Sequence, residues 1–206
     1  YNDSDKHFFP RMQDNTQSRP QLYKMWMESW GSRRSSPTLA DNIVFTIRYQ
    51  IAWMFWRYFM WNFAGKQTSE QGYFGWDITQ GNLASGVGLL DKARLHNMSE
   101  LPDSMKEAEG RNRYFMLPFL FGLLGLIFHF QKRKNDALGL LAMFIITGIG
   151  IIIYSNQPPN EPRERDYVLV GSFFTYCIWI GLAVPALYEI FRERVNLSSP
   201  VSAILG

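Results

Sequence analysis

The chain has 206 residues, a formal net charge of +3, three histidines and a single cysteine, Cys177. This count excludes an internal disulfide framework and any zinc-binding pattern, and we expect Cys177 to be a small core residue within its apolar run. The basic residues are spread along the chain without the dense stripe that nucleic-acid binding requires, so we expect no nucleic-acid partner. There is no nucleotide-binding loop and no metal-ligand cluster, and we expect neither a cofactor nor a metal.

Composition divides the chain into two regions. Residues 1–113 are polar, aromatic and rich in turns, which predicts a loop-rich extracytoplasmic region. It begins with a compact apolar and basic cluster at residues 8–12, followed by a short helix at 22–30. Residues 114–206 alternate long apolar runs with short charged connections, which predicts a transmembrane region.

A helix is predicted for residues 42–64, with Asp41 or Asn42 as its N-cap and Gly65 as its stop. About 22 residues at 1.5 Å each give a rod of roughly 33 Å, long enough to cross a bilayer. The helix is apolar and aromatic almost all round, and such aromatic density is typical of the headgroup zone.

The polar side chains of this helix fall on two lines at helical spacing. One line holds Thr46, Gln50 and Arg57, and the nearly opposite line holds Arg48 and Asn62. An arginine near the centre of a spanning helix costs about 2.5–3.5 kcal/mol on insertion scales, and this helix has two. We therefore expect an interfacial or re-entrant helix, packed against other protein, rather than a span.

The glycine-rich and then charged stretch at 65–113 predicts loops, with a weak helix around 103–110. A connection this long is usually functional or ordered against a partner surface.

Three apolar runs, with no charge in their interior, occur at about 114–130, 137–155 and 168–189. Each is long enough to be a membrane span, and the start of a further span is predicted near residue 199. We therefore expect an all-α integral membrane protein with about three transmembrane helices, an aromatic interfacial helix and long extracytoplasmic loops. Because the span predicted near residue 199 has barely begun when the sequence ends, we expect a piece of a longer protein.

The basic residues give only a weak indication of which side of the membrane each connection faces. Lysines and arginines near the helix ends are equal in number on the two sides, so the positive-inside rule does not decide. The short connection at 131–136 concentrates three basic residues, which favours the cytoplasm for that side. The connection at 154–167, the aromatic helix and residues 65–113 then share the outer side.

The connection between the second and third runs is the first candidate site. Arg163 and Arg165 each offer a planar donor fork suited to phosphate or carboxylate. Glu161, Glu164 and Asp166 could hold these arginines, bind a metal or act as acid or base. Composition alone favours the alternative of a solvated turn whose charges merely avoid the membrane.

Arg57, with Trp61 and Asn62, is the second candidate. An arginine in an aromatic helix can meet a lipid phosphate or a cation–π partner. The alternative, which composition favours, is snorkelling of the guanidinium to the headgroups.

Several segments carry a family resemblance: residues 8–12 (FFPRM), 56–65 (WRYFMWNFAG), 156–167 (NQPPNEPRERDY), 170–173 (VGSF) and 178–181 (IWIG). They resemble the bacterial glycosyltransferase family 117, large multi-span membrane proteins related to protein O-mannosyltransferases and formerly classed as a domain of unknown function. The resemblance covers nearly the whole chain and implies an internal fragment of such a protein.

The resemblance implies an enzyme of the bacterial cytoplasmic (inner) membrane that transfers a sugar from a polyprenyl-phosphate-linked donor to a protein or other acceptor on the outer face. Such enzymes carry the catalytic carboxylate in an early extracytoplasmic loop that this segment lacks, so no catalytic residue is assigned. Expected partners are the donor, membrane lipids and the rest of the full-length chain. The implied substrate-binding positions are Arg163, Arg165, Glu161, Glu164, Asp166, Tyr167, Arg57, Trp61 and Asn62.

The chain departs mildly from the family pattern. Pro159 and Asn160 stand where a leucine and a Gln- or Glu-like residue are expected, and Lys66 stands where arginine is usual. An alternative from another class is a non-catalytic polytopic membrane protein, such as a lipid transporter or an assembly subunit. Ionisable residues inside spans or broken helices in paired repeats would indicate it, and neither appears in the three apolar runs.

Overall fold

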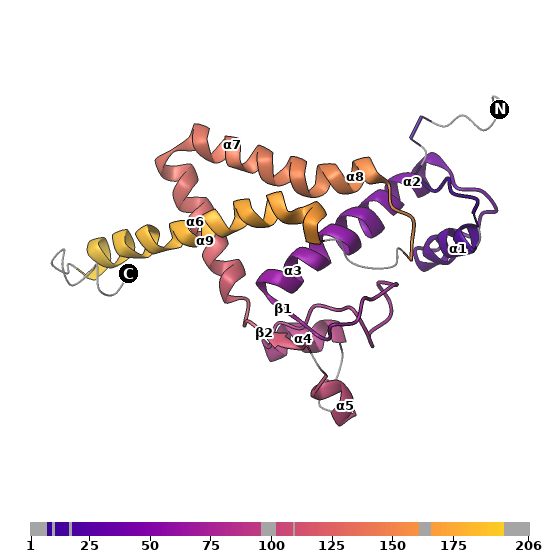
Figure 1. Ribbon diagram of the computed structural model, residues 1–206, viewed down its shortest axis with the longest axis horizontal. Helices are drawn as coiled ribbons and strands as arrows, with labels where there is room; N and C mark the ends of the chain where they lie inside the picture. The colour runs from indigo at the N-terminus through magenta and orange to yellow at the C-terminus, as the bar shows by residue number, and fades with distance from the viewer. Residues whose placement is uncertain are drawn as a thin grey trace.

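The computed structural model describes residues 8–9, 11–16, 18–95, 102–108, 110–160 and 166–195, which are mostly helical (Figure 1). Two short strands, β1 (Gly65–Lys66) and β2 (Asn112–Arg113), pair antiparallel. The helices are α1 (Arg19–Ser29), α2 (Leu39–Phe45), α3 (Tyr58–Phe63), α4 (Gly88–Leu95), α5 (Asp103–Lys106), α6 (Leu117–Lys132), α7 (Lys134–Ile145), α8 (Ile151–Ser155) and α9 (Asp166–Val195), with π-helical segments η2 (Thr46–Arg57) and η4 (Ile146–Gly150).

One continuous helix, formed by α2, η2 and α3, runs through the middle of the molecule; we call it the central helix. Its predicted stop is confirmed: Gly65 adopts φ +140°, and a side chain there would collide with the carbonyl oxygen of Ala84. Its predicted N-cap is wrong. Thr38 caps the helix, and Asp41 is the third helical residue of a reciprocal capping box.

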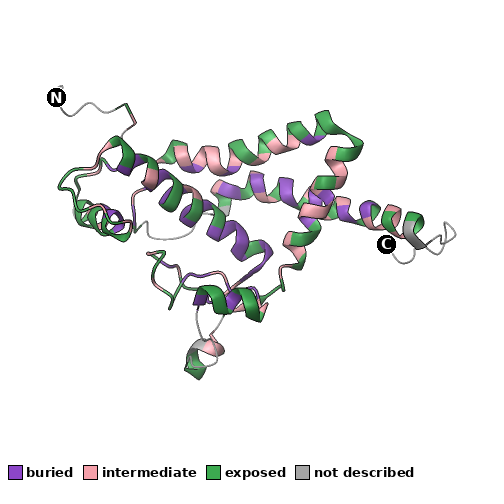
Figure 2. Ribbon diagram, turned by 180° about the vertical axis from the view of Figure 1, so that it is seen from behind, coloured by how far each residue is buried: buried purple, intermediate pink, exposed green. Residues whose placement is uncertain are grey.

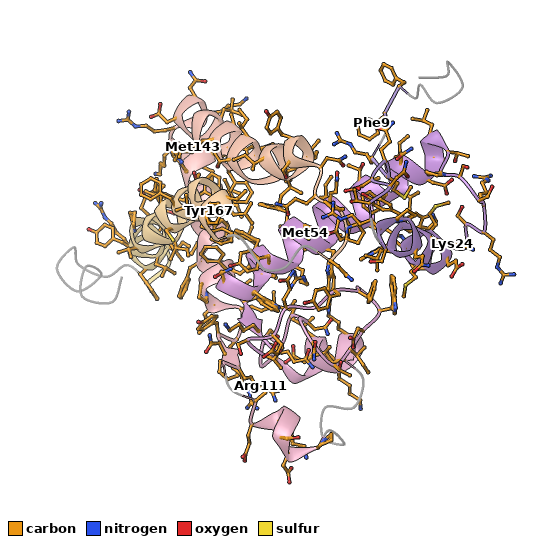
Figure 3. The ribbon with its side chains drawn as sticks, turned by 45° about the vertical axis from the view of Figure 1, so that its right-hand side comes forward. Phe9, Lys24, Met54, Arg111, Met143 and Tyr167 are labelled. Atoms are coloured by element: carbon orange, nitrogen blue, oxygen red, sulfur yellow. The ribbon has the colours of Figure 1, made fainter. Side chains whose placement is uncertain are left out.

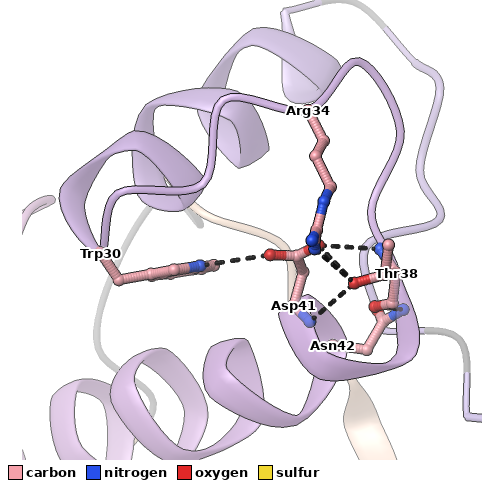
Figure 4. Close-up of polar contacts among 5 residues, drawn as sticks. All are labelled: Trp30, Arg34, Thr38, Asp41 and Asn42. Carbon is pink, nitrogen blue, oxygen red and sulfur yellow. Dashed lines mark hydrogen bonds and ion pairs between the residues drawn. The ribbon is translucent and has the colours of Figure 1, made fainter.

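The Asp41 carboxylate joins the end of α1 to the start of α2 (Figure 4). It accepts hydrogen bonds from the backbone N–H of Thr38 at 2.9 Å and its hydroxyl at 2.6 Å, and it pairs with Arg34. Trp30 Nε1 donates to its other oxygen at 3.4 Å. Burial opposes ionisation of this carboxyl, but the hydrogen bonds from Thr38 outweigh it, and the pKa of Asp41 is lowered.

The other elements bury most of the central helix, as the purple ribbon in Figure 2 shows. Phe45, Tyr49, Phe55 and Phe59 are almost fully buried among other aromatic rings. The expected packing of this helix against other protein is therefore confirmed, while its place at a membrane interface stays a prediction. Figure 3 shows the side chains that fill the space between the central helix, which carries Met54, and α9, which carries Tyr167 near its start.

Two helices are long and apolar enough to cross a membrane: the continuous helix Lys134–Ser155 and the stretch Tyr167–Glu193 of α9. Within these helices the most apolar windows are only 17% and 33% buried, so most of their residues keep part of their surface exposed. α6 is also apolar but has 16 residues, about 24 Å, which is shorter than the roughly 30 Å hydrocarbon core. Of the three predicted spans, two therefore reach full length, and the span predicted near 199 lies outside the described residues.

α6 and α9 pack closely and run in the same direction. Gly122 lies against the ring of Tyr176, and Gly125 against the backbone of Trp179, where an added Cβ would collide with the carbonyl oxygen. Consequently the starts of α6 and α9 lie at one end of this pair. Cys177, one residue beyond Tyr176, is exposed, so its predicted core position is wrong.

The opposite end of this pair carries the basic turn between α6 and α7. There Lys132 forms an ion pair with Glu189 of α9. The basic turn therefore lies at the end of this pair away from β2 and the start of α6 (Figure 1), while its placement on the cytoplasmic side stays a prediction.

The N-terminal segment is fastened to both the central helix and the end of α8. The Asn42 amide oxygen accepts the backbone N–H groups of Arg11 at 2.7 Å and Met12 at 3.0 Å. Arg11 Nη1 donates to the carbonyl oxygen of Ile153 at 2.6 Å, and Asn156 Nδ2 donates to the carbonyl oxygen of Arg11 at 3.2 Å. Within the cluster predicted at residues 8–12, Arg11 and Met12 thus attach the N-terminal segment to the central helix and α8.

The first half of the proline-rich connection is also bonded to the central helix. Gln50 Nε2 donates to Asn156 Oδ1 at 2.7 Å, and the Tyr49 hydroxyl donates to the carbonyl oxygen of Pro158 at 2.9 Å. Asn156 adopts a left-handed conformation (φ 44°) that ends α8. Residues 156–159 are therefore a packed connection and not a freely solvated turn.

Candidate functional site

A cavity of about 540 Å³ gathers three of the predicted substrate-binding residues, Trp61, Asn62 and Tyr167. Glu161, Arg163, Glu164 and Arg165 lie outside the described residues, as does the side chain of Asp166, the first residue of α9. Arg57 does not line this cavity.

Four elements build the cavity. α3 contributes Tyr58 as well as Trp61 and Asn62, and the paired strands bring in Lys66 and Asn112. The remaining wall comes from Ser69, from Tyr114 before α6, and from Val170 and Phe173 of α9. We call it the amide–tyrosine cavity, after its two asparagines and three tyrosines.

Trp61 is held rigidly at the wall of this cavity. Its Nε1 donates to the carbonyl oxygen of Asn82 at 2.8 Å. Asn82 in turn donates through Nδ2 to Gln67 Oε1 at 3.1 Å and to the carbonyl oxygen of Asp77 at 2.8 Å. This network orders the loop that follows β1, confirming that part of the long connection at 65–113 is ordered against the central helix.

Polar groups of the cavity remain available for a ligand. Asn62 Nδ2 donates to the carbonyl oxygen of Tyr58 at 2.8 Å, and its amide oxygen makes no hydrogen bond within the described part of the chain. The Lys66 ammonium lies 5.9 Å from the Trp61 ring centre and forms no ion pair with any described residue. Since none of the described lining residues is Asp, Glu, His or Cys, the wall offers hydrogen bonds and one positive charge.

Arg57 is buried on another side of the central helix. Its Nε donates to the carbonyl oxygen of Trp53 at 3.1 Å, and Nη1 donates to that of Gly81 at 3.0 Å. The guanidinium carbon lies 4.4 Å from the Trp53 ring centre and 4.8 Å from that of Trp61. The predicted cation–π contact of Arg57 is therefore confirmed. The alternative, snorkelling of the guanidinium to the headgroups, is wrong because the side chain is only 3% exposed.

The cavity that Arg57 lines has a volume of about 380 Å³ and also contains Arg48 and Arg94. Four tryptophans, Trp26, Trp53, Trp56 and Trp76, form much of its wall, and we call it the arginine–tryptophan cavity. Sequence reasoning missed Arg94 here, and Lys66, Asn112 and Tyr114 in the first cavity. No local pattern marks these residues, because only the fold of the long connection brings them to the central helix.

Among the described residues, no group of three or more His, Cys, Asp or Glu side chains is placed to hold a metal ion.

Comparison with known protein families relates the first part of the chain to one of them. A family of unknown function (DUF8416) matches residues 1–47, which contain α1, α2 and the first residues of η2. The matched part includes Trp26 and Ser29 of the arginine–tryptophan cavity and none of the residues that line the amide–tyrosine cavity. Neither the curated proteins nor the solved structures contain a match to this chain.

Proposed function

We propose that this chain is part of a membrane glycosyltransferase whose amide–tyrosine cavity binds a polyprenyl-phosphate-linked sugar donor. The observation that carries the proposal is the meeting of Trp61 and Asn62 with Tyr167 at one cavity. These residues come from residues 56–65 and 156–167, two of the segments in which the chain resembles glycosyltransferase family 117.

The lining suits a phosphorylated sugar. Asparagine amides and tyrosine hydroxyls both donate and accept, as sugar hydroxyls require. Lys66 supplies a positive charge for the phosphate, and the volume lies within the usual range of about 300–1,000 Å³ for ligand sites. Arg163 and Arg165 remain our predicted phosphate ligands; Arg165 precedes Tyr167 by two residues in the chain.

The apolar helices support a place in a membrane. In the continuous helix Lys134–Ser155 and in α9 most residues keep part of their surface exposed, and lipid tails or further helices of a longer chain would cover it. We propose the bacterial inner membrane, with the cavity on the outer side, the acceptor at that face, and the catalytic carboxylate in the remainder of the full-length protein.

Two pairs of variants in the full-length protein test the donor site. Arg163→Ala should abolish sugar transfer from a polyprenyl-phosphate sugar in membrane vesicles, whereas Arg133→Ala at the α6–α7 turn should leave it normal. Asn62→Ala should lower transfer about tenfold or more, because a charged or polar ligand group loses a partner, and Asn135→Ala should not. Normal transfer by Arg163→Ala and Asn62→Ala, with normal membrane insertion, would overturn the proposal.

The exposed thiol of Cys177, followed by peptide mapping in the full-length protein, tests the membrane placement. In intact vesicles a lipid-covered thiol in the middle of α9 should resist a charged maleimide and react only after denaturation in dodecyl sulfate. Rapid labelling of intact vesicles would contradict a lipid-facing α9.

One observation favours the alternative of a lipid transporter or assembly subunit. The second apolar helix is not uniformly α-helical, since η4 interrupts it near Gly148. π-helical segments of this kind are frequent at functional sites. Under this alternative Arg163→Ala would alter lipid movement between leaflets, and no sugar transfer would be measured for any variant.

A further inference from the structure

The arginine–tryptophan cavity is built from segments that are distant in sequence. Trp26 comes from α1, Trp53 and Arg57 from η2, Trp76 from the loop after β1, and Arg94 from α4. Trp26, Trp53 and Arg57 are each at least nine-tenths buried. A cavity whose wall includes such buried, mutually packed groups is preformed and is not a chance depression of the surface.

The wall of this cavity carries an unusual concentration of positive charge. Arg48, Arg57 and Arg94 all line it, and none of its described lining residues is Asp or Glu. Arg48 and Arg94 form no ion pair with any other described residue. Because like charges repel at close range, three guanidinium groups around one cavity raise the free energy of the empty site and favour a bound anion.

The position of Arg94 agrees with this account. Loss of water around its guanidinium and the positive charge of Arg57 both lower the pKa of Arg94. The side chain as a whole is still exposed, so Arg94 lies where it can reach a ligand at the cavity mouth. Arg48 is likewise exposed on η2.

The tryptophans define the rest of the ligand. The ring centres of Trp26 and Trp76 are 5.0 Å apart in an edge-on arrangement, and Trp26 and Trp53 are 6.5 Å apart. Indole faces provide rigid apolar area against which a ring can lie. Arginine forks match the oxygens of a phosphate group in a bidentate manner, which a single lysine does not.

We propose that the arginine–tryptophan cavity binds a phosphate ester, with its phosphate held by Arg48 and Arg94 and its organic part against the tryptophan rings. This site goes beyond the proposed donor site, since the two cavities share no lining residue. A phosphate ester of this kind has two sources: a water-soluble sugar phosphate or the headgroup of an anionic phospholipid.

Binding to the purified full-length protein tests the proposal without any sugar transfer. Glucose 6-phosphate serves as the soluble probe in calorimetric titration, and glucose is its uncharged control. Nanodiscs of phosphatidylglycerol and of phosphatidylcholine serve as the lipid arms, with thermal unfolding as the readout. Saturable binding of glucose 6-phosphate but not glucose would support a soluble ligand; a higher Tm in phosphatidylglycerol would support a lipid headgroup.

Variants assign either signal to this cavity. Arg48→Gln and Arg94→Gln are suitable because both side chains are exposed and their loss should not disturb folding. Each should weaken binding about tenfold, or remove the difference between the two lipids, since a charge-assisted hydrogen bond is lost. Arg133→Gln, an exposed arginine at the α6–α7 turn, is the matched control and should behave like wild type.

Three results would overturn the proposal: no response to either probe, unchanged responses in Arg48→Gln and Arg94→Gln, or an equal loss in Arg133→Gln. None of these results depends on the donor site, because the substituted residues do not line the amide–tyrosine cavity.

Discussion

The two cavities flank one central helix but differ in charge. The amide–tyrosine cavity has one lysine among its described lining residues, together with neutral amides and phenols. The arginine–tryptophan cavity has three arginines and four indole rings. Arg57, Trp61 and Asn62 lie within six consecutive residues, yet they are divided between these cavities.

The difference shows that a short aromatic motif can serve two sites at once. The contact between the Arg57 guanidinium and the Trp61 ring, 4.8 Å from guanidinium carbon to ring centre, connects the two walls. Both walls also hold the same loop, because Arg57 binds the carbonyl oxygen of Gly81 and Trp61 binds that of Asn82. Some substitutions should therefore disturb both cavities, and others should disturb only one of them.

Arg57→Met should have the largest effect and should disturb both cavities. It removes two hydrogen bonds to carbonyl oxygens and two cation–π contacts, so we expect the free energy of unfolding to fall by about 3 kcal/mol. Denaturant unfolding in detergent measures this. Arg48→Met removes the same charge from an exposed position and should change stability by less than about 0.5 kcal/mol. Equal stability of the two variants would contradict the role of Arg57.

Gly125→Ala should distinguish the two cavities, because we expect it to affect ligand binding only at the amide–tyrosine cavity. The new Cβ would collide with the Trp179 backbone and push α6 from α9, costing about 2 kcal/mol as overpacking does. Tyr167, in the first turn of α9, and Tyr114, three residues before α6, both line that cavity. Gly139→Ala on α7 meets no atom within 4 Å and is the control for thermal unfolding. Equal loss of ligand binding at both cavities would refute this distinction.

Trp61→Phe should have a smaller effect, because it keeps an aromatic ring at the wall and removes the indole N–H together with the five-membered part of the indole. The carbonyl oxygen of Asn82 keeps its bond from the backbone N–H of Gln67, so we expect a loss of about 1 kcal/mol. Trp56→Phe is the comparison, since Trp56 is 46% exposed and should tolerate the change. A loss in Trp56→Phe as large as in Trp61→Phe would argue against the bond to Asn82.

Low pH should cause the smallest loss of stability, and this loss should be confined to the part of the molecule that carries the arginine–tryptophan cavity. The folded-state pKa of Asp41 is lowered, so its ionised carboxylate stabilises the fold. This contribution to the free energy of unfolding is complete above about pH 4, the ordinary pKa range of a carboxyl, and is lost as the pH falls toward the folded-state pKa. The carboxylate fastens α1, which carries Trp26, so we expect a loss of up to about 1 kcal/mol near pH 3. Limited proteolysis of residues 31–37 should increase below pH 4 in wild type and show no such pH dependence in Asp41→Asn.

Local signals in the sequence were sufficient for most of the helices. Gly65 ends the central helix as expected, the helices at 134–155 and 166–195 follow apolar runs bounded by polar residues, and α1 overlaps the short helix predicted at 22–30. The N-cap was misassigned although a signal existed: Thr38 and Asp41 have the three-residue spacing of a capping box. Cys177 was misassigned because a helix that is apolar all round gives no sign of which face is covered.

The candidate site was less predictable, because its side chains depend on helix geometry and on long-range contacts. Gln50 and Arg57 were expected on one line at a period of 3.6, but η2 is π-helical, and its wider turns change that register. Gln50 instead meets Asn156, whereas Arg57 meets Gly81. Lys66 and Asn112 face each other through strand pairing across more than forty residues, which no local pattern encodes.

The fastening of Arg11 to the end of α8 has a consequence for synthesis. Its partners Ile153 and Asn156 follow it by 142 and 145 residues, so these bonds cannot form until the ribosome has made the apolar helix Lys134–Ser155. At about 5–20 residues per second, the N-terminal segment must wait on the order of ten seconds for its partners. During that interval the aromatic cluster of α1 and the central helix lacks Ile152 and Leu169, the members that α8 and α9 contribute to it. The nascent chain therefore passes through a stage in which this cluster is incomplete.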